Sequence, residues 1–399
     1  MLSLESLSWL VSGPGQEALA LAESLEPGEE TFLAVAQRLG RRFPDVLARV
    51  AVEQAILRRR ALSKFPRASE MYFLREALEQ STGYRVAAYH ADRLSEHAPR
   101  FDLGCGIGGD ALALAAQGPT IAIDHDALRA HVLQANARSL GLDANLQVVR
   151  GDLLRPAWHM PSTAVAFADP ARRRQGRRIH DPARYEPPLA VLVGLADRAA
   201  GVGIKVSPAI DRIEIDSLGA EVEFISDGGD LKECVLWFGE LRTAASRGTL
   251  LPSRHTLTGP EADGQSASPI LEYLYEPDPA VMRAGLVRRL AELSGALQID
   301  PGLALLTSAS LRDTPFATAY RVLDVMPFSE KALRGELRRR GVGQVTLKKR
   351  GSAVDTEALG RRLRLTGSGS ATVLLTRVLR RPLAILVEPL ASGQHPPSV

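Results

Sequence analysis

The sequence predicts an α/β fold: a Rossmann-like, mostly parallel sheet, an N-terminal helical region and a small C-terminal α+β domain. Three observations predict it. Residues 1–95 place apolar side chains at three- and four-residue spacing, which is typical of helices. Residues 98–240 alternate short apolar strands with helical stretches, as a parallel sheet with helices on both faces requires. Residues 271–392 contain both patterns within one short segment.

Composition places the chain among ordinary globular proteins and excludes several classes. Apolar residues make up 45% of the 399 residues and charged residues 24%. The only cysteines are Cys105 and Cys234, which excludes a disulfide scaffold and a four-cysteine zinc site. No stretch approaches the length of apolar sequence that a membrane helix needs, and the first residues lack the basic flank of a signal peptide. We therefore expect a cytoplasmic protein without a membrane partner.

The N-terminal region is expected to be helical throughout. Pro44 and Asp45 stand where one helix would begin. Ser69 and Glu70 stand where another would begin. The apolar spacing predicts helices over 17–25, 30–39, 45–62 and 69–81.

The central region alternates strands and helices along the chain. Its last two strands are joined by the Gly-rich turn 227–230, which is short enough for an antiparallel hairpin. The predicted helices are 110–118, 126–141 and 183–199. The predicted strands are 100–104, 120–124, 146–152, 164–170, 201–207, 220–226 and 233–239.

The C-terminal part follows a segment that is rich in Ser, Thr, Gly and Pro. This segment, 243–270, is expected to be a linker or an irregular loop. A helix is predicted over 276–296, followed by a domain of βαβαββ order, whose helices open at the capping residues Ser329 and Asp355. Its expected strands are 319–328, 344–351, 371–379 and 382–390.

Charge is concentrated in this last domain. The segment from Arg321 to Arg381 contains 15 Lys and Arg against 5 Asp and Glu, a net charge of +10, whereas the whole chain carries +3. A compact basic segment indicates a polyanionic partner. A solvated, arginine-rich surface explains the charge equally well.

The strongest local signal is the segment 102–110, DLGCGIGGD, which directly follows a strand and opens a helix. Its Gly104, Gly106 and Gly109 match the dinucleotide fingerprint G-x-G-x-x-G. A nicotinamide-dependent dehydrogenase is therefore one interpretation. Glycines in such a turn let the backbone approach a ligand closely, and the helix behind it favours negative charge.

Three acidic residues at successive strand ends favour a different cofactor. Asp102 would repel a pyrophosphate but could hold an ammonium group. Asp124 ends the second strand, where it could bind two ribose hydroxyls of either cofactor. Asp152 follows the third strand and could accept a hydrogen bond from an adenine amino group.

These motifs together resemble the class I S-adenosylmethionine-dependent methyltransferases. The sequence is most similar to a bacterial subgroup with a helical N-terminal region, a D-P-A-R-R motif and a THUMP-like C-terminal domain. The matching segments are 64–94, the glycine turn, 169–178, 203–211, 223–239 and the segment after Tyr320. The resemblance implies a seven-stranded methyltransferase sheet with antiparallel last strands. It also implies a helical region 1–95, a methyltransferase domain 96–242, a linker 243–270 and a C-terminal region 271–392, THUMP-like from about 318.

The resemblance implies S-adenosylmethionine as the cofactor and gives roles to particular residues. Asp169 and Pro170 would lie beside the transferring methyl group, with Arg172 completing the catalytic set. Ala171 and Arg172 stand where related enzymes carry proline and an aromatic residue, so the stacking ring is missing and amine methylation is in doubt. Arg172 could instead stack on a base or pair with a phosphate. The cofactor-binding residues would be Asp102, Gly104, Cys105, Gly106, Asp124, His125, Asp152, Leu153 and Asp169.

RNA is the expected substrate and partner, with a tRNA or rRNA base as target, because THUMP-type domains are associated with structured RNA. No metal is expected, since the eight histidines show no metal-ligand spacing. The alternatives are a protein or small-molecule methyltransferase, and a non-catalytic, methyltransferase-like RNA-binding protein. The expected substrate-binding residues are Arg173, Arg177, Arg178, Lys205, Lys348, Lys349 and Arg350.

Overall fold

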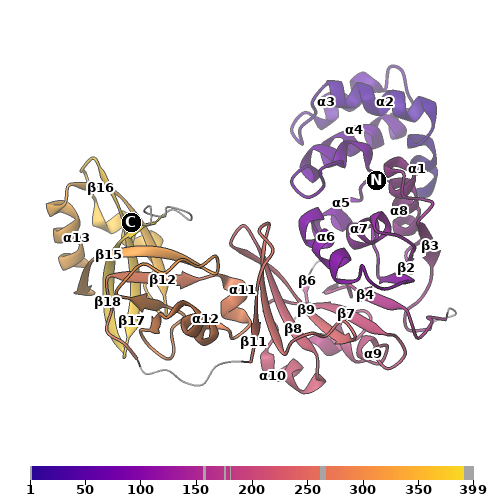
Figure 1. Cartoon of the computed structure of the whole chain (residues 1–399). Helices are drawn as coiled ribbons and strands as arrows, with labels where there is room; N and C mark the ends of the chain where they lie inside the picture. Colours follow the sequence, from indigo (N-terminus) through magenta and orange to yellow (C-terminus); the bar gives the residue numbers. More distant parts are fainter. Residues whose placement is uncertain (1, 156–158, 175–176, 180, 261–266, 391–399) are drawn as a thin grey trace, which may run out of the picture. The chain divides into compact units, whose positions relative to one another are not determined.

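The chain divides into two compact units in the computed structural model (Figure 1). The first unit holds residues 1–221 and 233–243, so the N-terminal helices and the main sheet belong together. The second unit holds residues 222–232 and 244–399. The structure describes residues 2–155, 159–174, 177–179, 181–260 and 267–390.

The main sheet is doubly wound, as the sequence predicts. Among the described residues it has nine strands rather than the predicted seven, because two further strands, described below, extend it. The seven predicted strands are β1 (Arg100–Leu103), β2 (Thr120–Asp124), β3 (Leu146–Arg150), β4 (Val165–Ala168), β7 (Gly201–Val206), β8 (Glu221–Asp227) and β9 (Asp230–Gly239). In the first unit they follow the order β3-β2-β1-β4-β7-β9, all parallel except β9, which runs antiparallel to β7. Every residue of β1, β4 and β7 is buried, because helices cover both faces of a parallel sheet.

Helices follow β1, β2, β4 and β7 along the chain, as expected for crossovers between parallel strands. The predicted helix over 183–199 is shorter than expected, because Pro187 and Pro188 cannot continue a helix and α9 begins only after them. The helices are α7 (Gly109–Ala116), α8 (Ala127–Leu140), α9 (Leu189–Val193) and α10 (Arg212–Ile215), with 3-10 turns at Pro182–Arg184 and Asp216–Leu218.

The N-terminal region is helical, as predicted, and its buried side chains share one apolar core with α7, α8 and the glycine turn. Ser3 caps the first helix and Ser12 the second, each through its side-chain oxygen. The elements are α1 (Leu4–Leu10), α2 (Gly13–Ser24), α3 (Phe32–Leu39), α4 (Asp45–Ala61), a 3-10 turn (Ala68–Glu70), α5 (Arg75–Gln80) and α6 (Tyr84–Arg93).

The expected single helix over 69–81 is wrong, because its middle is extended. The backbone N–H of Phe73 donates to Gln54 Oε1 at 2.9 Å, and Gln54 Nε2 donates back to the Phe73 carbonyl at 2.7 Å. Asn136 of α8 forms the same pair of bonds with Tyr72, at 2.6 and 3.1 Å. Two buried amide side chains thus replace the helical backbone bonds of this segment, and they tie it to α4 and α8.

The segment 243–270 is not irregular throughout, contrary to expectation. It contains β10 (Ser246–Leu251), which pairs in parallel with β8, and β11 (His255–Gly259), which pairs antiparallel with β10. A Cβ at Gly248 would lie 3.2 Å from the backbone of Ala280 and Val281, so this glycine lets the following helix pack closely on β10. The Ser, Thr and Gly content of the segment 243–270 predicts a loop. In β10, however, close packing of the helix favours small residues.

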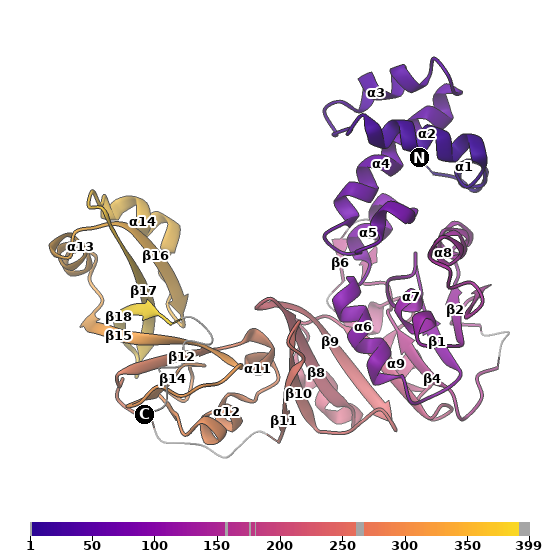
Figure 2. The ribbon, with the colours of Figure 1, turned by 45° about the horizontal axis from the view of Figure 1, so that its top comes forward.

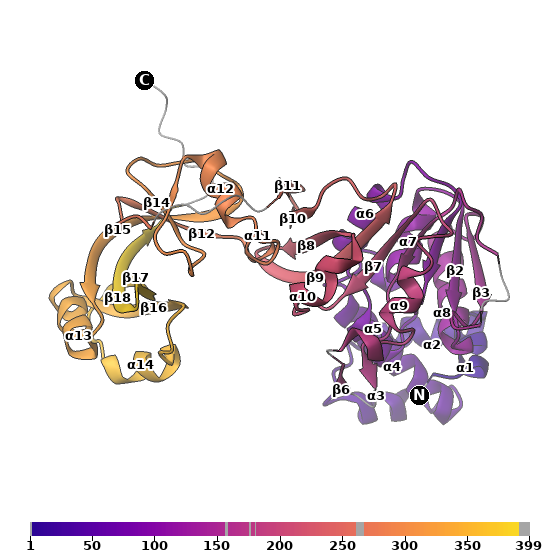
Figure 3. The same cartoon turned by 90° about the horizontal axis from the view of Figure 1, so that it is seen from below.

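The rest of the second unit is a seven-stranded sheet in the order β13-β14-β12-β15-β18-β17-β16. The predicted βαβαββ order is confirmed over its last six elements, and α13 and α14 lie on the same face of the sheet (Figures 2 and 3). The predicted helix over 276–296 is divided at Gly285, where φ is +74°. The elements are β12 (Tyr273–Pro277), α11 (Pro279–Arg283), α12 (Val287–Ser294), β13 (Leu297–Gln298), β14 (Leu306–Ser308), β15 (Ala317–Pro327), α13 (Glu330–Arg339), β16 (Val342–Arg350), α14 (Thr356–Leu363), β17 (Gly369–Val378) and β18 (Arg381–Pro389).

Candidate cofactor and active site

The glycine turn after β1 meets the segment after β4 at the carboxyl ends of the parallel strands. Gly104 has a φ of +86°, and a Cβ there would lie 2.9 Å from the backbone oxygen of Asp169. Gly106 has a φ of +54°, and its N–H donates to Asp124 Oδ2 at 2.8 Å. The positive φ values therefore favour glycine at both positions. The turn lies against Asp124 and Asp169, so three of the predicted motifs meet here.

A cavity in the first unit lies at this edge of the sheet and has two adjoining lobes. The lobes share Gly104, Arg129, Asp169 and Ala171 in their walls. The first lobe is lined by the segment 77–82 and by the predicted residues Asp102, Gly104, Cys105, Gly106, Pro170 and Arg172. The second is lined by the predicted residues Asp124, His125, Asp152 and Leu153.

Asp102 provides a buried carboxyl group at the first lobe. Its side chain is 1% exposed, and its Oδ2 has no hydrogen-bond partner among the described residues. Burial, together with the negative charges of Asp110 and Asp169, raises the pKa of Asp102 well above its usual range. An ammonium group would give Oδ2 a donor and offset the crowded negative charge. The site therefore fits the amino-acid moiety of S-adenosylmethionine.

Asp124 and Asp152 lie in the second lobe with backbone contacts that fix their carboxylates. Asp124 accepts hydrogen bonds from the N–H groups of Gly106 at 2.8 Å and Asp126 at 2.9 Å. Asp152 Oδ1 accepts from the Leu154 N–H at 2.9 Å. A carboxylate has about four lone-pair sites, so each retains acceptor capacity for ribose hydroxyls or an adenine amino group.

Asp169 follows β4 and remains 24% exposed at the cavity, while its Oδ2 accepts a hydrogen bond from Lys205 Nζ at 2.9 Å. The segment beyond it is held by two backbone hydrogen bonds between Ala171 and Glu186, at 2.9 and 3.1 Å. Arg172 is half-buried in the wall of the first lobe. The backbone then forms the two-stranded hairpin β5 (Arg173–Arg174) and β6 (Arg177–Arg178). The side chains of Arg173, Arg177 and Arg178 lie outside the described residues.

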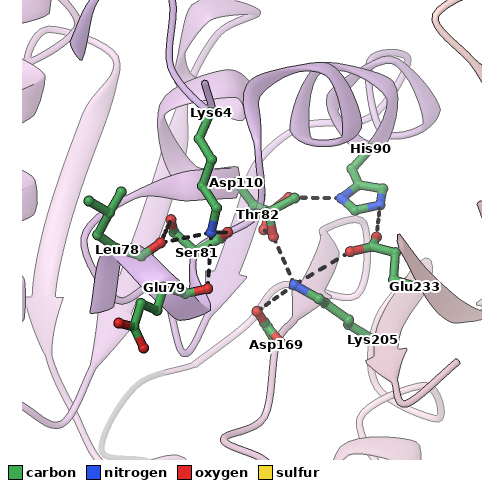
Figure 4. Close-up of polar contacts among 10 residues, drawn as sticks. All are labelled: Lys64, Leu78, Glu79, Ser81, Thr82, His90, Asp110, Asp169, Lys205 and Glu233. Carbon is green, nitrogen blue, oxygen red and sulfur yellow. Dashed lines mark hydrogen bonds and ion pairs between the residues drawn. The ribbon is translucent and has the colours of Figure 1, made fainter. Parts of the chain in front are cut away.

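A closed ring of buried polar side chains contains Lys205 (Figure 4). Lys205 Nζ donates to Thr82 Oγ1 at 2.9 Å, and Thr82 Oγ1 donates to Asp110 Oδ2 at 2.6 Å. The other oxygen of Asp110 lies 2.8 Å from His90 Nδ1. His90 Nε2 lies 2.6 Å from Glu233 Oε1, and Glu233 Oε2 lies 3.4 Å from Lys205 Nζ. We call these five residues the buried ring.

The buried ring holds its members in their charged forms. Burial opposes the charge on His90, but Glu233 and Asp110 outweigh burial and raise the pKa of His90 to about 10. Burial would raise the pKa of Glu233, but Lys205 and His90 lower it to about 2. Burial likewise opposes the charge on Lys205, and the carboxylates of Asp169 and Glu233 still raise its pKa above the usual value. At neutral pH the ring therefore contains two cations, His90 and Lys205.

The N-terminal region supplies a wall of the first lobe. Lys64 Nζ donates to the carbonyl oxygens of Leu78, Glu79 and Ser81, at 2.7, 3.0 and 3.0 Å (Figure 4). Burial, and the positive charge of Lys205, lower the pKa of Lys64 to about 8. Three carbonyls on one ammonium fix the shape of the segment that lines the lobe.

Sequence reasoning missed the buried ring, although a signal for it was present. Lys205 is a charged residue inside an apolar strand, and Glu233 directly precedes the apolar run of β9. A charge in such a strand needs a partner, because burying an unpaired charge is very costly. The partners, Thr82, His90 and Asp110, come from distant parts of the chain, so the sequence does not reveal which residues meet.

The predicted basic residues of the second unit lie at the end of β16, an edge strand of its sheet. Lys348 Nζ donates to Glu276 Oε2 at 3.0 Å and to the Tyr320 hydroxyl at 2.7 Å. Arg350 also forms an ion pair with Glu276, whereas Lys349 is exposed. Two of the three expected RNA contacts are therefore engaged with a carboxylate of their own domain.

Among the described residues, no group of three or more His, Cys, Asp or Glu side chains could hold a metal ion. No helix in that part of the chain has both the length and the apolar character needed to cross a membrane.

The fold and the cavity define a class of protein. A parallel sheet with an antiparallel β9, a glycine turn after β1, and acidic residues at or just beyond the carboxyl ends of β1 to β4 is the arrangement of Rossmann-like methyltransferases. A protein of Mycobacterium tuberculosis, named an uncharacterized S-adenosylmethionine-dependent methyltransferase, is 36% identical over 340 residues. The match covers 82% of this chain and 92% of that protein. The chain therefore belongs to the S-adenosylmethionine-dependent methyltransferases, and its cofactor is S-adenosylmethionine.

Other comparisons agree with this fold and with the C-terminal expectation. A crystal structure from Porphyromonas gingivalis W83, named as that of a methyltransferase, has a TM-score of 0.74 to this chain at 20% identity. It covers 94% of this chain and 99% of its own, and it shows the fold. A family model described as THUMP domain-like matches residues 317–389. A model of a domain of unknown function, DUF8688, matches residues 3–61.

Proposed function

We propose that this methyltransferase modifies a base of RNA. The observation that carries the proposal is a cluster of exposed arginines where α13 and α14 end. Arg338 of α13 donates to the backbone oxygen of Arg364 at 3.0 Å, so the two helix ends are adjacent. Arg361 is exposed on α14, and Arg339 is exposed on α13, where it also pairs with Glu336. Clustered guanidinium groups bind the phosphates of a nucleic acid backbone, and such contacts position a protein on RNA.

Two sequence features support the same substrate class. The segment from Arg321 to Arg381 has a net charge of +10. The THUMP-like match falls on the same segment, and THUMP-type domains are associated with structured RNA. Lys349 adds a further exposed cation, although its neighbours Lys348 and Arg350 are paired with Glu276.

S-adenosylmethionine, when bound, supplies a methyl group that its sulfonium activates. Asp102 would hold the ammonium group of the cofactor, and Asp124 would accept hydrogen bonds from the ribose. Asp169 would then orient the nucleophile, because a carboxylate accepts hydrogen bonds and so favours a nucleophile that carries a hydrogen. Arg172, in the wall of the same lobe, would contact a phosphate or stack on a base. Alignment of this kind is most of what methyl transfer needs from the protein.

The test uses purified protein and S-adenosylmethionine that carries a labelled methyl group. Total RNA and total protein, both from cells that lack the gene, are offered separately. We expect label in one RNA size class, and no label there with the Asp169→Ala variant. Label in protein alone would overturn the RNA proposal. Cofactor binding with no label in either fraction would overturn it in favour of a small-molecule substrate or a non-catalytic protein.

The arginine cluster has its own test. The Arg338→Ser/Arg361→Ser variant should bind the labelled RNA more weakly at 100 mM salt, and its affinity should depend less on salt. Each lost phosphate contact lowers the slope of log K against log salt by about 0.7–0.9. The Arg289→Ser/Arg321→Ser variant carries the same charge change and replaces two arginines that pair with glutamates elsewhere in the second unit. Equal loss of affinity in both double variants would show that net charge, rather than the cluster, binds RNA.

A further inference from the structure

We propose that Lys205 is a positioning residue for methyl transfer, which holds the Asp169 carboxylate in the orientation that receives the nucleophile. This inference rests on the role of Asp169 under the proposed function, but it is independent of the substrate class. Lys205 reaches Asp169 Oδ2 from β7, the strand next to β4 in the sheet. Its side chain is 6% exposed, so it contacts the inside of the wall rather than the open cavity.

The ammonium of Lys205 is engaged with groups of the protein itself, through two hydrogen bonds and one further ion pair. It carries three hydrogens. Three acceptors surround it: Asp169 Oδ2 at 2.9 Å, Thr82 Oγ1 at 2.9 Å and Glu233 Oε2 at 3.4 Å. Lys205 was expected to bind substrate directly, and the geometry assigns it instead to the support of Asp169.

The rest of the buried ring fixes the ammonium in space. Thr82 is held by Asp110, and Glu233 is held by His90, so neither acceptor of Lys205 can turn independently. The five residues of the ring lie on one loop and four elements: the loop before α6, α6 itself, α7, β7 and β9. Without these partners the flexible side chain of Lys205 could move, and the Asp169 carboxylate could rotate. The closed ring therefore gives Asp169 one orientation, and a 1 Å error in such an orientation can cost about 100-fold in rate.

Stability alone does not account for this ring. A buried ion pair is often no more stable than apolar residues of similar volume, because both charges lose their hydration. The ring nevertheless places two cations and the carboxylate of Glu233 in the interior of the first unit. Thr82 and Asp110 of the ring line the first lobe, and Lys205 binds Asp169 Oδ2 at the same wall. That position favours a role in holding Asp169.

The experiment separates positioning from charge balance. Lys205→Met removes one of the two cations beside Glu233 and the cation beside Asp169, so this variant is expected to have a lower Tm. The Lys205→Met/Glu233→Gln variant removes both charges and should recover most of that Tm. Lys232→Met is the matched control, since Lys232 is a half-exposed lysine whose ion pair joins it to Asp230. Cofactor affinity is measured by calorimetry with S-adenosylmethionine, and kcat with the fraction that wild-type protein labels, whether RNA or protein.

We expect the double variant to lose about 100-fold in kcat while its affinity for S-adenosylmethionine changes less than about threefold, because alignment rather than binding is lost. A double variant with near wild-type kcat would overturn the proposal, since Lys205 would then only balance Glu233. Label in protein alone would overturn the RNA proposal and leave this test intact. If neither RNA nor protein is labelled, kcat has no substrate, and a crystal structure of the double variant tests the inference instead. An Asp169 side chain in its original orientation would overturn the inference.

Discussion

Asp102→Asn is expected to weaken cofactor binding and, at the same time, to stabilise the empty protein. The Asp102 carboxylate is 1% exposed, and one of its oxygens has no partner among the described residues. Its raised pKa means that the folded state disfavours the charge at neutral pH, because burial and Asp110 oppose it. Asparagine has nearly the same shape without the charge. The substitution removes the buried charge and also removes the charged partner of the cofactor's ammonium group.

The magnitude follows from one charge-assisted contact. A hydrogen bond to a charged group contributes about 1.5–3 kcal/mol. Since about 1.4 kcal/mol is a factor of ten, Asp102→Asn should weaken S-adenosylmethionine binding about 10- to 100-fold. Calorimetric titration measures this loss. Methylthioadenosine, which lacks the amino-acid moiety, is the control ligand and should bind both proteins equally. Thermal unfolding without ligand should give a Tm equal to or above that of the wild type.

Two results would refute this reasoning. Equal loss of affinity for S-adenosylmethionine and methylthioadenosine would show that Asp102 shapes the cavity rather than binding the ammonium group. A clear fall in Tm without ligand would show that the buried charge has a stabilising partner in the protein. Asp143→Asn provides the matched control, because Asp143 is an exposed aspartate of the same unit, and it should change neither quantity.

Two further predictions concern the glycine turn and the buried ring. Gly104→Ala should lower both Tm and cofactor affinity, because the new Cβ meets the Asp169 carbonyl at 2.9 Å. Gly141 has a φ of +73° and open space around it, so Gly141→Ala should lower the unfolding free energy by only about 1–2 kcal/mol, through backbone strain. Equal cofactor affinities for the two variants would contradict this prediction. The charge of His90 should stabilise the fold fully below pH 6.5, and this contribution should be lost as pH rises through about 10. The difference in unfolding free energy between the wild type and His90→Gln should therefore shrink between pH 7 and 10, and a difference independent of pH would show that His90 stabilises by packing alone.

The main sheet and the cofactor turn could be predicted from the sequence because both depend on local patterns. Apolar runs separated by helical stretches require a parallel sheet, and the glycines of 102–110 directly follow the first strand. Sequence patterns predicted the wrong element where side chains replaced the backbone hydrogen-bond partners of a segment. The segment 69–81 has helical spacing, yet Gln54 and Asn136 take over the backbone bonds of its middle. They also failed at β10, where Gly248 is required by close packing although glycine usually indicates a loop.

The contacts of the candidate site were harder to predict than its cofactor motifs, for a physical reason. Motif residues such as Asp124 lie a few positions from a glycine or a strand end, so spacing reveals them. The contacts of Lys205 depend on which strands become neighbours, and it meets residues that lie 123 and 36 positions away in the chain. A buried lysine indicates that a partner exists, but only the tertiary structure identifies that partner.

The N-terminal helices are better understood as part of the catalytic unit than as an appendage. Lys64 holds the segment that lines the first lobe, Thr82 binds Lys205, and His90 closes the ring with Glu233. Each of these residues precedes the first strand of the sheet, and each contributes to the wall of the cavity or to the support of Asp169. Removing this region would take Thr82 and His90 away from Asp110, Lys205 and Glu233, and it would also remove the segment 77–82 from the wall of the first lobe. The buried ring, and with it the proposed orientation of Asp169, therefore depends on the helices that come before the sheet.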